Sequence, residues 1–437
     1  MGDKHVVVID DGINEGYYPC GDLLYNMEID PDGTLLTRTG YDPYRVSHGT
    51  NCAGIIRKYA PGAVLSSVKI ISDDRSTTSK KLLLQALTWC LSIPADLIHM
   101  SLGTRCFADF DEIAGIVGKL AERGTLLVAA CDNLNRVSCP ASLNTVIGVK
   151  CDEEGLLQDG QHLFHSKPYD GIEITARGGH SLVNFRGETS MTSVCNSYAA
   201  PYVSALLCQF MQNNPKLSLE EARRLLDAAG LRQSKRAPVP VDPPPLSVPI
   251  LGVVGEADAA HLWGMRLGRL FREDGYCSAV VSASTLADDP CGGIVSLPYH
   301  QAEEDRLLQA VVAAYDPDVI LLCLGEGTHD RDFAREVEKR YGIDIKIAIR
   351  PGNRCKVDPN PLEGPGRWFA ATGGSPKTGD GGCLPLEGAM PMEPSWTPLL
   401  DDAALSRLYK AIVERLEAAE ADQGPGTPLV QVWPQPI

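Results

Sequence analysis

The sequence predicts an α/β protein of two domains, each with a mostly parallel sheet covered by helices. Three observations support this prediction. Short apolar runs alternate with segments of helical periodicity along residues 1–230, and the same alternation resumes over 249–420. The length of 437 residues also exceeds the roughly 250–300 residues at which a single hydrophobic core stops growing.

The first domain, residues 1–230, is expected to contain five short buried strands separated by helices. The strands are HVVVID (5–10), VLSSVKII (64–71), DLIHMSL (96–102), TLLVAA (125–130) and TVIGVK (145–150). The helices are 80–91, 111–124, 201–212 and 218–230, the last opening on a capping box of Ser218 and Glu221. Strands separated by helices are typical of a three-layer fold around a parallel sheet.

A proline-rich linker at 231–248 leads to the second domain, residues 249–420. Strands are expected at 249–255, 278–283, 318–325 and 344–350, with helices at 261–275, 303–315, 332–342 and 401–420. This is a second three-layer α/β pattern, followed by a proline-rich tail at 421–437. We interpret the domain as either a docking module or a dimerisation module. In the second case the protein would be a homo-oligomer.

Two glycine-rich stretches of the second domain are candidates for a nucleotide site. Residues 252–258 (GVVGEAD) lie between a strand and a helix, where a phosphate loop would lie, but the Gly-Lys-Ser/Thr ending is absent. Residues 372–380 (TGGSPKTGD) lie in a long glycine- and proline-rich stretch. We therefore expect no cofactor.

Composition limits the partners. The net charge of −16 argues against a nucleic acid and mildly favours a cationic substrate. The 14 cysteines include no C-x-x-C pair, and several lie in apolar runs, as expected for buried thiols of a reducing compartment.

The sequence has no signal peptide and no membrane span, so we expect a cytoplasmic protein without a membrane partner. Residues 30–33 (DPDG) lack EF-hand spacing and are interpreted as a turn, so no metal is expected.

Three sequence motifs contain residues that could be catalytic. A buried strand ends on Asp10, His48 stands where a helix begins, and Ser197 precedes another helix. Each has an ordinary structural explanation alone: a turn, a structural histidine and a helix start. Together they follow the order Asp, His, Ser, which is one of the known orders of a serine-hydrolase triad.

Residues 5–210 resemble the catalytic domain of the subtilisin family (subtilases). Six motifs carry the resemblance in the family's order: VVIDDGIN, HGTNCAG, IHMSLGT, VAACDN, CPASLNTVIGV and NSYAAPYVS. The architecture and the N-S-Y-A-x-P motif also resemble, more loosely, subtilases that mature ribosomally made modified peptides by removing their leaders. The resemblance implies a subtilisin-like three-layer domain and a peptide substrate.

Ser197 is the expected nucleophile among three nearby serines. Thr189–Met191 reads TSM, as in the family, but no alanine or proline follows in register. Ser197 instead has Ala199 and Pro201 at the matching offsets, so Ser190 is the weaker alternative and Ser193 weaker still.

The resemblance then implies a role for each site residue. Ser197 would attack the peptide carbonyl, His48 would act as base and then acid, and Asp10 would hold the imidazole. Asn133 would donate its amide to the oxyanion, against the alternative of a turn asparagine. The remaining predicted residues would bind substrate: Ser101, Leu102, Gly103, Ala130 and Asp132.

Three positions depart from the family pattern. Asp11 follows the catalytic Asp in place of Ser or Thr, and Cys195 replaces a glycine two residues before Ser197. Cys195 either restricts the backbone there or packs as a small thiol. Asp132 replaces a glycine beside the pocket for the residue before the cleaved bond, so it either selects Lys or Arg or is a solvated turn residue.

The sequence therefore predicts an intracellular subtilisin-like serine endopeptidase that removes the leader from a precursor peptide. No propeptide precedes the first strand, as expected of an enzyme that acts without self-processing. The sequence is also compatible with two other functions: a catalytically impaired scaffold that binds peptide, and a general housekeeping protease.

Overall fold

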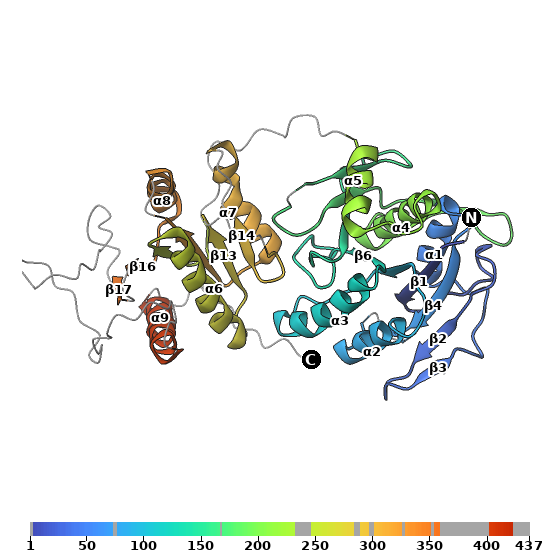
Figure 1. Ribbon diagram of the computed structural model, residues 1–437, viewed down its shortest axis with the longest axis horizontal. Helices are drawn as coiled ribbons and strands as arrows, with labels where there is room; N and C mark the ends of the chain where they lie inside the picture. Colours follow the sequence, from blue (N-terminus) through green and yellow to red (C-terminus); the bar gives the residue numbers. More distant parts are fainter. Residues whose placement is uncertain are drawn as a thin grey trace, which may run out of the picture. The chain divides into compact units, whose positions relative to one another are not determined.

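The computed structural model describes residues 3–72, 77–166, 168–231, 246–283, 289–296, 301–325, 328–350, 354–358 and 402–422. The chain divides into two compact units (Figure 1), the first comprising Met1–Pro238 with Asp289–Cys291 and the second comprising the rest. Three stretches lie outside the described residues: residues 232–245 of the linker predicted at 231–248, the stretch 372–380, and the tail beyond residue 422.

The first unit is built on a sheet of nine strands in the order β3-β2-β4-β1-β5-β6-β7-β9-β8. Its long central strands are apolar and buried, and the sheet is parallel except at its two edges, where β3 and β8 run antiparallel. The strands are β1 (His5–Asp10), β2 (Asn26–Ile29), β3 (Leu35–Thr37), β4 (Val64–Lys69), β5 (Leu97–Met100), β6 (Leu126–Ala130), β7 (Ile147–Cys151), β8 (His162–Phe164) and β9 (Ile174–Ala176).

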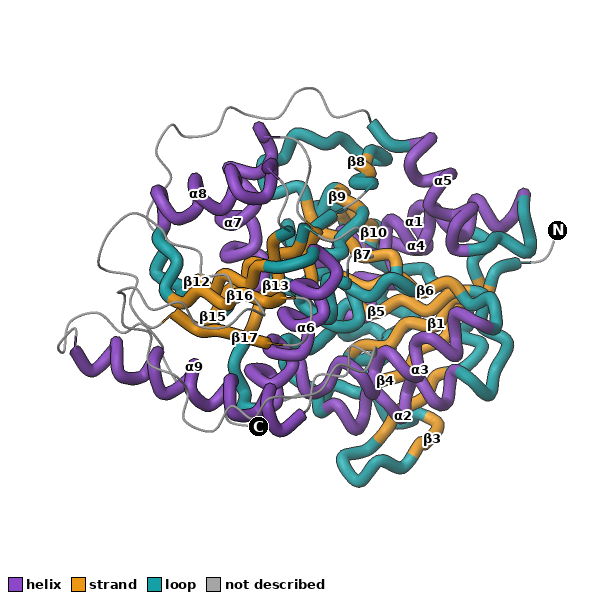
Figure 2. The backbone as a smooth tube through the Cα atoms, turned by 60° about the vertical axis from the view of Figure 1, so that its left-hand side comes forward, coloured by secondary structure: helices purple, strands orange, loops and turns teal. Residues whose placement is uncertain are grey.

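Helices cover this sheet, and the buried face of α4 supplies much of the core. Helix α4 packs on α1 and on strands β5, β6 and β7, while α2 and α3 pack on each other (Figure 2). The helices are α1 (His48–Tyr59), α2 (Lys80–Cys90), α3 (Phe110–Glu122), α4 (Asn196–Asn213) and α5 (Leu219–Ala229). A separate antiparallel hairpin joins β10 (Ser181–Val183) to β11 (Thr189–Met191).

The structure confirms the α/β class and the mostly parallel sheet. All five strands predicted for the first unit are present, and the capping box of Ser218 and Glu221 opens α5. The helix predicted at 201–212 begins five residues earlier, at Asn196, because Pro201 does not end the helix. The short strands β2, β3, β8 and β9 were not predicted, since three or four residues carry too little alternation to distinguish them from loops.

The second unit contains a six-stranded sheet in the order β14-β13-β15-β12-β16-β17, parallel except for the last pair. Helix α6 (Ala257–Glu273) lies close to this sheet because Gly264 and Gly268 face it. A Cβ atom at Gly268 would lie 3.0 Å from Val280. The strands are β12 (Ile250–Val254), β13 (Ser278–Ser282), β14 (Ile294–Ser296), β15 (Val319–Leu324), β16 (Ile345–Arg350) and β17 (Arg354–Asp358), and the other helices are α7 (Gln301–Tyr315), α8 (Thr328–Tyr341) and α9 (Asp402–Asp422).

Within the described part of the chain, no helix combines the length and the apolar character needed to cross a membrane.

Candidate active site

Asp10 is the last residue of β1, the strand that lies between β4 and β5. Its side chain is buried, with 1% of the residue exposed. One carboxylate oxygen accepts a 2.8 Å hydrogen bond from the backbone N–H of Asp11, and both oxygens lie 2.9 Å from Nδ1 of His48. Burial raises the pKa of Asp10, and the adjacent imidazole opposes this increase.

His48 is the first residue of α1, and its backbone is held by the carboxylate of Asp11. The two oxygens of that carboxylate accept hydrogen bonds from the backbone N–H groups of His48 (3.0 Å) and Gly49 (2.7 Å). A carboxylate at a helix N-terminus satisfies free N–H groups and complements the helix dipole. A Cβ atom on Gly49 would lie 2.8 Å from the carbonyl oxygen of Gly12, so glycine is required there. Asp11, the first departure from the family pattern, therefore positions the histidine.

The charge of Asp10 also affects the ionisation of His48. Burial lowers the pKa of the imidazole, but the neighbouring Cys52 sulfur, together with the negative charge and the hydrogen bond of Asp10, raises it, and the net change is upward. An imidazole with Nδ1 bonded to a carboxylate presents Nε2 to its other side.

Ser197 is the second residue of α4 and lines the same cavity as Asp10 and His48. This cavity has a volume of about 710 Å³. The alternatives Ser190 and Ser193 line a different cavity, and Ser190 belongs to the exposed strand β11. The geometry therefore favours Ser197 over both of them.

Cys195 precedes α4 as its N-cap residue. Its backbone is extended, with φ −159° and ψ 164°, a conformation that every residue type adopts readily. Its side chain packs against the hydrophobic core of the first unit. The structure therefore supports the explanation that Cys195 packs as a small thiol, and not the explanation that it restricts the backbone.

Pro201 lies in the interior of α4, whereas the helix predicted at 201–212 would begin with this proline. In a regular helix the N–H of residue 201 would donate to the carbonyl oxygen of Ser197, but proline has no N–H. The hydroxyl of Ser101 donates to that carbonyl oxygen instead, at 2.8 Å. Ser101 thus contacts the nucleophile's own backbone.

The predicted oxyanion segment lies along the same cavity, which Asn133 and Asp132 both line. Asn196, which is 1% exposed, connects this segment by hydrogen bonds to α4, the helix that carries Ser197. The amide nitrogen of Asn196 donates to the carbonyl oxygen of Asp132 (2.7 Å) and to Oδ1 of Asn135 (3.0 Å). Its amide oxygen accepts a 2.6 Å bond from the backbone N–H of Cys151. The sequence interpretation did not include Asn196, although an amide directly before the nucleophile was a usable signal.

The five predicted substrate-binding residues also line this cavity: Ser101, Leu102, Gly103, Ala130 and Asp132. Gly103 is required where it stands, because a Cβ atom would lie 2.7 Å from the carbonyl oxygen of Cys139. The carboxylate of Asp132 accepts a 3.3 Å hydrogen bond from the backbone N–H of Leu134. That bond is typical of a turn aspartate, yet the residue still faces the cavity.

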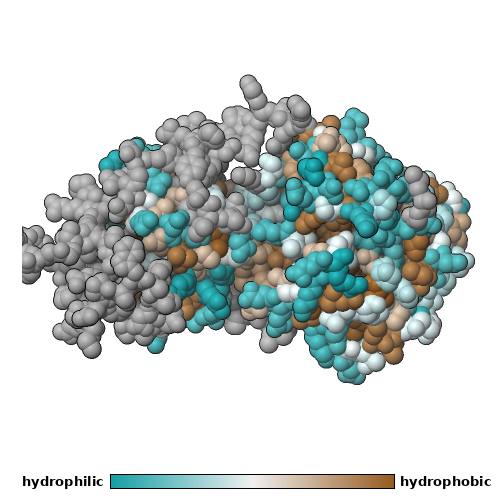
Figure 3. Space-filling view, viewed as in Figure 1, coloured by the Kyte–Doolittle hydropathy of each residue, from teal (hydrophilic) through white to brown (hydrophobic). Residues whose placement is uncertain are grey.

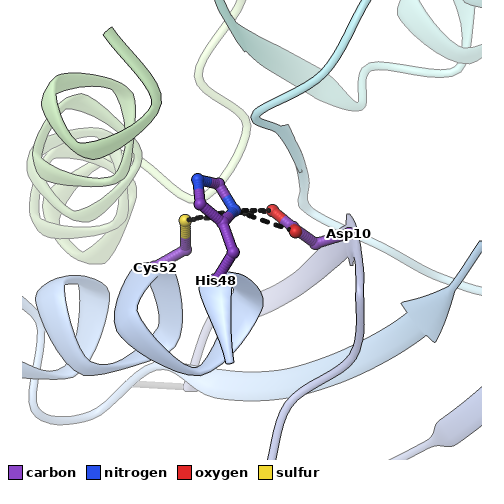
Figure 4. A group of neighbouring side chains, drawn as sticks. All are labelled: Asp10, His48 and Cys52. Atoms are coloured by element: carbon purple, nitrogen blue, oxygen red, sulfur yellow. Dashed lines mark hydrogen bonds and ion pairs between the residues drawn. The ribbon is translucent and has the colours of Figure 1, made fainter. Parts of the chain in front are cut away.

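Cys52 was not predicted, and it lies one helical turn beyond His48 (Figure 4). Its sulfur is 4.0 Å from Nδ1 of His48 and 3.9 Å from Oδ2 of Asp10. Burial raises the pKa of Cys52, which favours the neutral thiol. Asp10, His48 and Cys52 are a set of possible metal ligands, but a metal at Nδ1 would have to displace the bond to Asp10.

Part of the chain is similar to a curated protein and to solved structures. The minor extracellular protease Epr of Bacillus subtilis is 29% identical over 180 residues, which are 38% of this chain and 27% of the relative's length. Among solved structures, Sphericase has a TM-score of 0.42 at 24% identity, covering 52% of this chain and 83% of the other. A lanthipeptide protease has a TM-score of 0.43 at 17% identity, and the match covers 54% of this chain and 82% of the other. Residues 4–237, more than half of the chain, match the family described as the Subtilase family, and the protein belongs to that family.

Proposed function

We propose that the first unit is a serine endopeptidase with Asp10, His48 and Ser197 as its catalytic triad. The observation that carries the proposal is the position of the His48 ring. Its Nδ1 lies 2.9 Å from both oxygens of the buried Asp10, and the residue borders the cavity that Ser197 also lines. Membership of the subtilase family supports the same reaction.

The arrangement suits acyl transfer. The Ser197 hydroxyl attacks the carbonyl carbon of the substrate while His48 takes its proton, because a neutral serine is a weak nucleophile. His48 then gives the proton to the leaving amine, whose bond to carbon breaks to leave an acyl-enzyme on Ser197. Water, deprotonated by His48, hydrolyses this ester. Asp10 holds the ring and stabilises the imidazolium in both steps.

Asn133 and the backbone N–H of Ser197 would stabilise the oxyanion of each tetrahedral intermediate. Such donors act by being fixed where negative charge develops. The hydrogen bonds from Asn196 to Asp132 and Asn135 restrict the segment that carries Asn133, which supports this role.

We further propose a restricted substrate, namely a precursor peptide from which the enzyme removes a leader. The N-S-Y-A-x-P motif and the appended α/β unit support this substrate class, with the second unit as a docking or dimerisation module. A reducing, cytoplasmic location is part of the proposal, because each of the twelve cysteines whose side chain the structure describes is a free thiol.

A fluorophosphonate probe tests the triad directly. We expect the wild-type protein to be labelled at a single serine and Ser197→Ala to abolish labelling, while Ser190→Ala, the matched control on β11, labels normally. Labelling that survives Ser197→Ala would refute the assignment. An unlabelled wild-type protein that still binds peptide would be a binding scaffold.

A second experiment tests the substrate class. The leader proposal predicts that unfolded casein is cut slowly, while a precursor peptide is cut at one bond between leader and core. Rapid cleavage of casein at many sites would indicate a housekeeping protease instead.

A further inference from the structure

The His48 ring is held by Asp10 at one edge only. Both carboxylate oxygens lie 2.9 Å from Nδ1, and the other ring nitrogen, Nε2, lies away from Asp10 (Figure 4). The side chain of His48 is 31% exposed, so burial alone does not fix its orientation. Hydrogen bonds at one edge still allow the ring plane to tilt. A base that has to accept the Ser197 proton therefore benefits from a second contact that fixes this plane.

Tyr198 makes such a contact with the face of the His48 ring. The two rings are stacked, with centroids 5.0 Å apart and planes inclined by 24°. Aromatic rings at this separation attract one another when they stack with an offset. Tyr198 directly follows Ser197 in α4, whereas His48 is the first residue of α1. The stack thus connects the base with the residue beside the nucleophile.

The Tyr198 hydroxyl is held by Asn51, which also belongs to α1. The amide nitrogen of Asn51 donates a 2.9 Å hydrogen bond to this hydroxyl, and the amide oxygen accepts a bond of 2.9 Å from the hydroxyl of Tyr18. Asn51 follows His48 by three residues, so both side chains lie on the same face of the helix. Tyr198 therefore connects α4 to two points on one face of α1.

The backbone of Tyr198 has a partner outside α4. Its carbonyl oxygen lies 3.0 Å from Nε2 of His180, a residue that is 1% exposed. Since a carbonyl oxygen only accepts, Nε2 carries the proton, and Nδ1 of His180 accepts from the Tyr59 hydroxyl at 3.0 Å. Burial lowers the pKa of His180 to about 4, so the ring is neutral at neutral pH, as this arrangement requires. The main chain and the hydroxyl of Tyr198 are thus both fixed.

We propose that Tyr198 is a positioning residue for the general base. Its stacked ring keeps the plane of the His48 ring in the orientation in which Nδ1 bonds to Asp10 and Nε2 takes the Ser197 proton. The inference rests on the proposed endopeptidase function and deepens it. Burial raises the pKa of the Tyr198 hydroxyl, which stays protonated, so the residue acts on the reaction through His48.

Tyr198→Leu and Tyr198→Phe separate the contribution of the ring from that of the hydroxyl. Leucine removes the stack, so we expect kcat to fall about tenfold and KM to stay within about twofold of wild type, on the scale of one aromatic pair. Phenylalanine keeps the ring, so kcat should fall by only about threefold, as for one partly exposed hydrogen bond. The rate constant of fluorophosphonate labelling should change in parallel with kcat, because this small probe reacts with Ser197 without binding as a peptide.

Tyr25→Leu is the matched control. The Tyr25 ring also lies near a histidine, His5, with centroids 6.1 Å apart, but neither residue lines the cavity of the proposed active site. Apolar side chains are common on the surface of the first unit (Figure 3), so leucine should be tolerated at this position, which is 36% exposed. We expect kcat and the labelling rate of this variant to equal those of the wild-type protein.

Asn51→Ala tests the inference without changing Tyr198. It removes the hydrogen bond to the Tyr198 hydroxyl and should lower kcat by about threefold, as Tyr198→Phe does. The combination of the two substitutions should be no slower than either alone, because both remove the same bond.

A folded Tyr198→Leu variant with the kcat of the wild type would overturn the positioning role. A loss expressed in KM, or a Tyr198→Phe variant as slow as Tyr198→Leu, would also overturn it, and thermal unfolding would verify that each variant is folded. If Tyr198→Leu does not fold, additive effects of Asn51→Ala and Tyr198→Phe would overturn it instead. All these outcomes leave the triad in place, whereas a wild-type protein that neither cleaves peptides nor reacts with the fluorophosphonate would overturn the proposed function itself.

Discussion

The hydroxyl of Ser101 donates a 2.8 Å hydrogen bond to the carbonyl oxygen of Ser197. Since Ser101 uses its proton there, its oxygen accepts from Nε2 of His99, 2.9 Å away, and Nδ1 of His99 then accepts from Ser204. Burial lowers the pKa of His99 to about 3, so its ring is neutral. The chain of bonds connects β5 with two points of α4 and places the first turn of that helix relative to the sheet.

Ser101→Ala should therefore affect both stability and turnover. The substitution leaves a partly buried carbonyl oxygen without its hydroxyl partner, which costs about 1–3 kcal/mol of unfolding free energy. We expect kcat to fall more than KM rises, because Ser197 loses its fixed position. Urea unfolding and steady-state kinetics would measure the two effects.

Ser92→Ala is the matched control for this substitution. The Ser92 hydroxyl also donates to a backbone carbonyl, that of Trp89, but on an exposed turn. Its removal should change stability by less than about 0.5 kcal/mol. Equal effects of the two substitutions would show that the Ser101 bond contributes nothing specific to the site.

The pH dependence of activity should reflect the raised pKa of His48. The base must be neutral to accept the Ser197 proton, so activity is present above the His48 pKa and is lost as pH falls through it. We expect the acid limb of kcat/KM, measured with a peptide that has no titratable group, to have its midpoint above the ordinary histidine value of about 6.5.

Asp10→Asn should move that acid limb to lower pH. The variant removes one of the charges that raise the His48 pKa. It also favours the wrong imidazole tautomer, so kcat should fall by about 10⁴-fold, as in other triads. A midpoint that stays in place would show that another group controls the limb.

The oxyanion assignment predicts different effects for two neighbouring amides. Asn133→Ala should lower kcat by about 10²–10³-fold with little change in KM and in stability, a magnitude known from subtilisin itself. Asn196→Ala should lower kcat and also destabilise the fold, because Asp132 and Cys151 lose buried hydrogen bonds. Kinetics combined with thermal unfolding would separate these outcomes, and normal turnover in Asn133→Ala would contradict the assignment.

Periodicity was sufficient to predict the central strands, because buried strands need apolar residues. The order of the motifs was sufficient to select Asp10, His48 and Ser197, which the structure places along one cavity. The contacts that hold the site were harder to predict. Asp11, which follows β1, bonds to the backbone N–H of His48 in α1. Asn196 in α4 bonds to the backbone N–H of Cys151 in β7. Both bonds join residues that are far apart in the sequence, so no local sequence pattern predicts them. The start of α4 was missed for a similar reason: Ser101, distant in sequence, replaces the hydrogen bond that Pro201 cannot make.

We expect Asp132 to influence which side chain is accepted immediately before the cleaved bond. Its carboxylate lines the cavity and accepts one long bond, from Leu134, so it retains acceptor capacity for a cationic side chain. A partly solvated ion pair contributes up to about 1 kcal/mol, so we expect Arg peptides to be cleaved roughly threefold to fivefold faster in kcat/KM than matched Leu peptides. Asp132→Asn preserves the shape and the turn bond but removes the charge, and it should abolish the difference, as should high salt. A Leu preference in the wild-type enzyme would instead assign Asp132 to the turn alone.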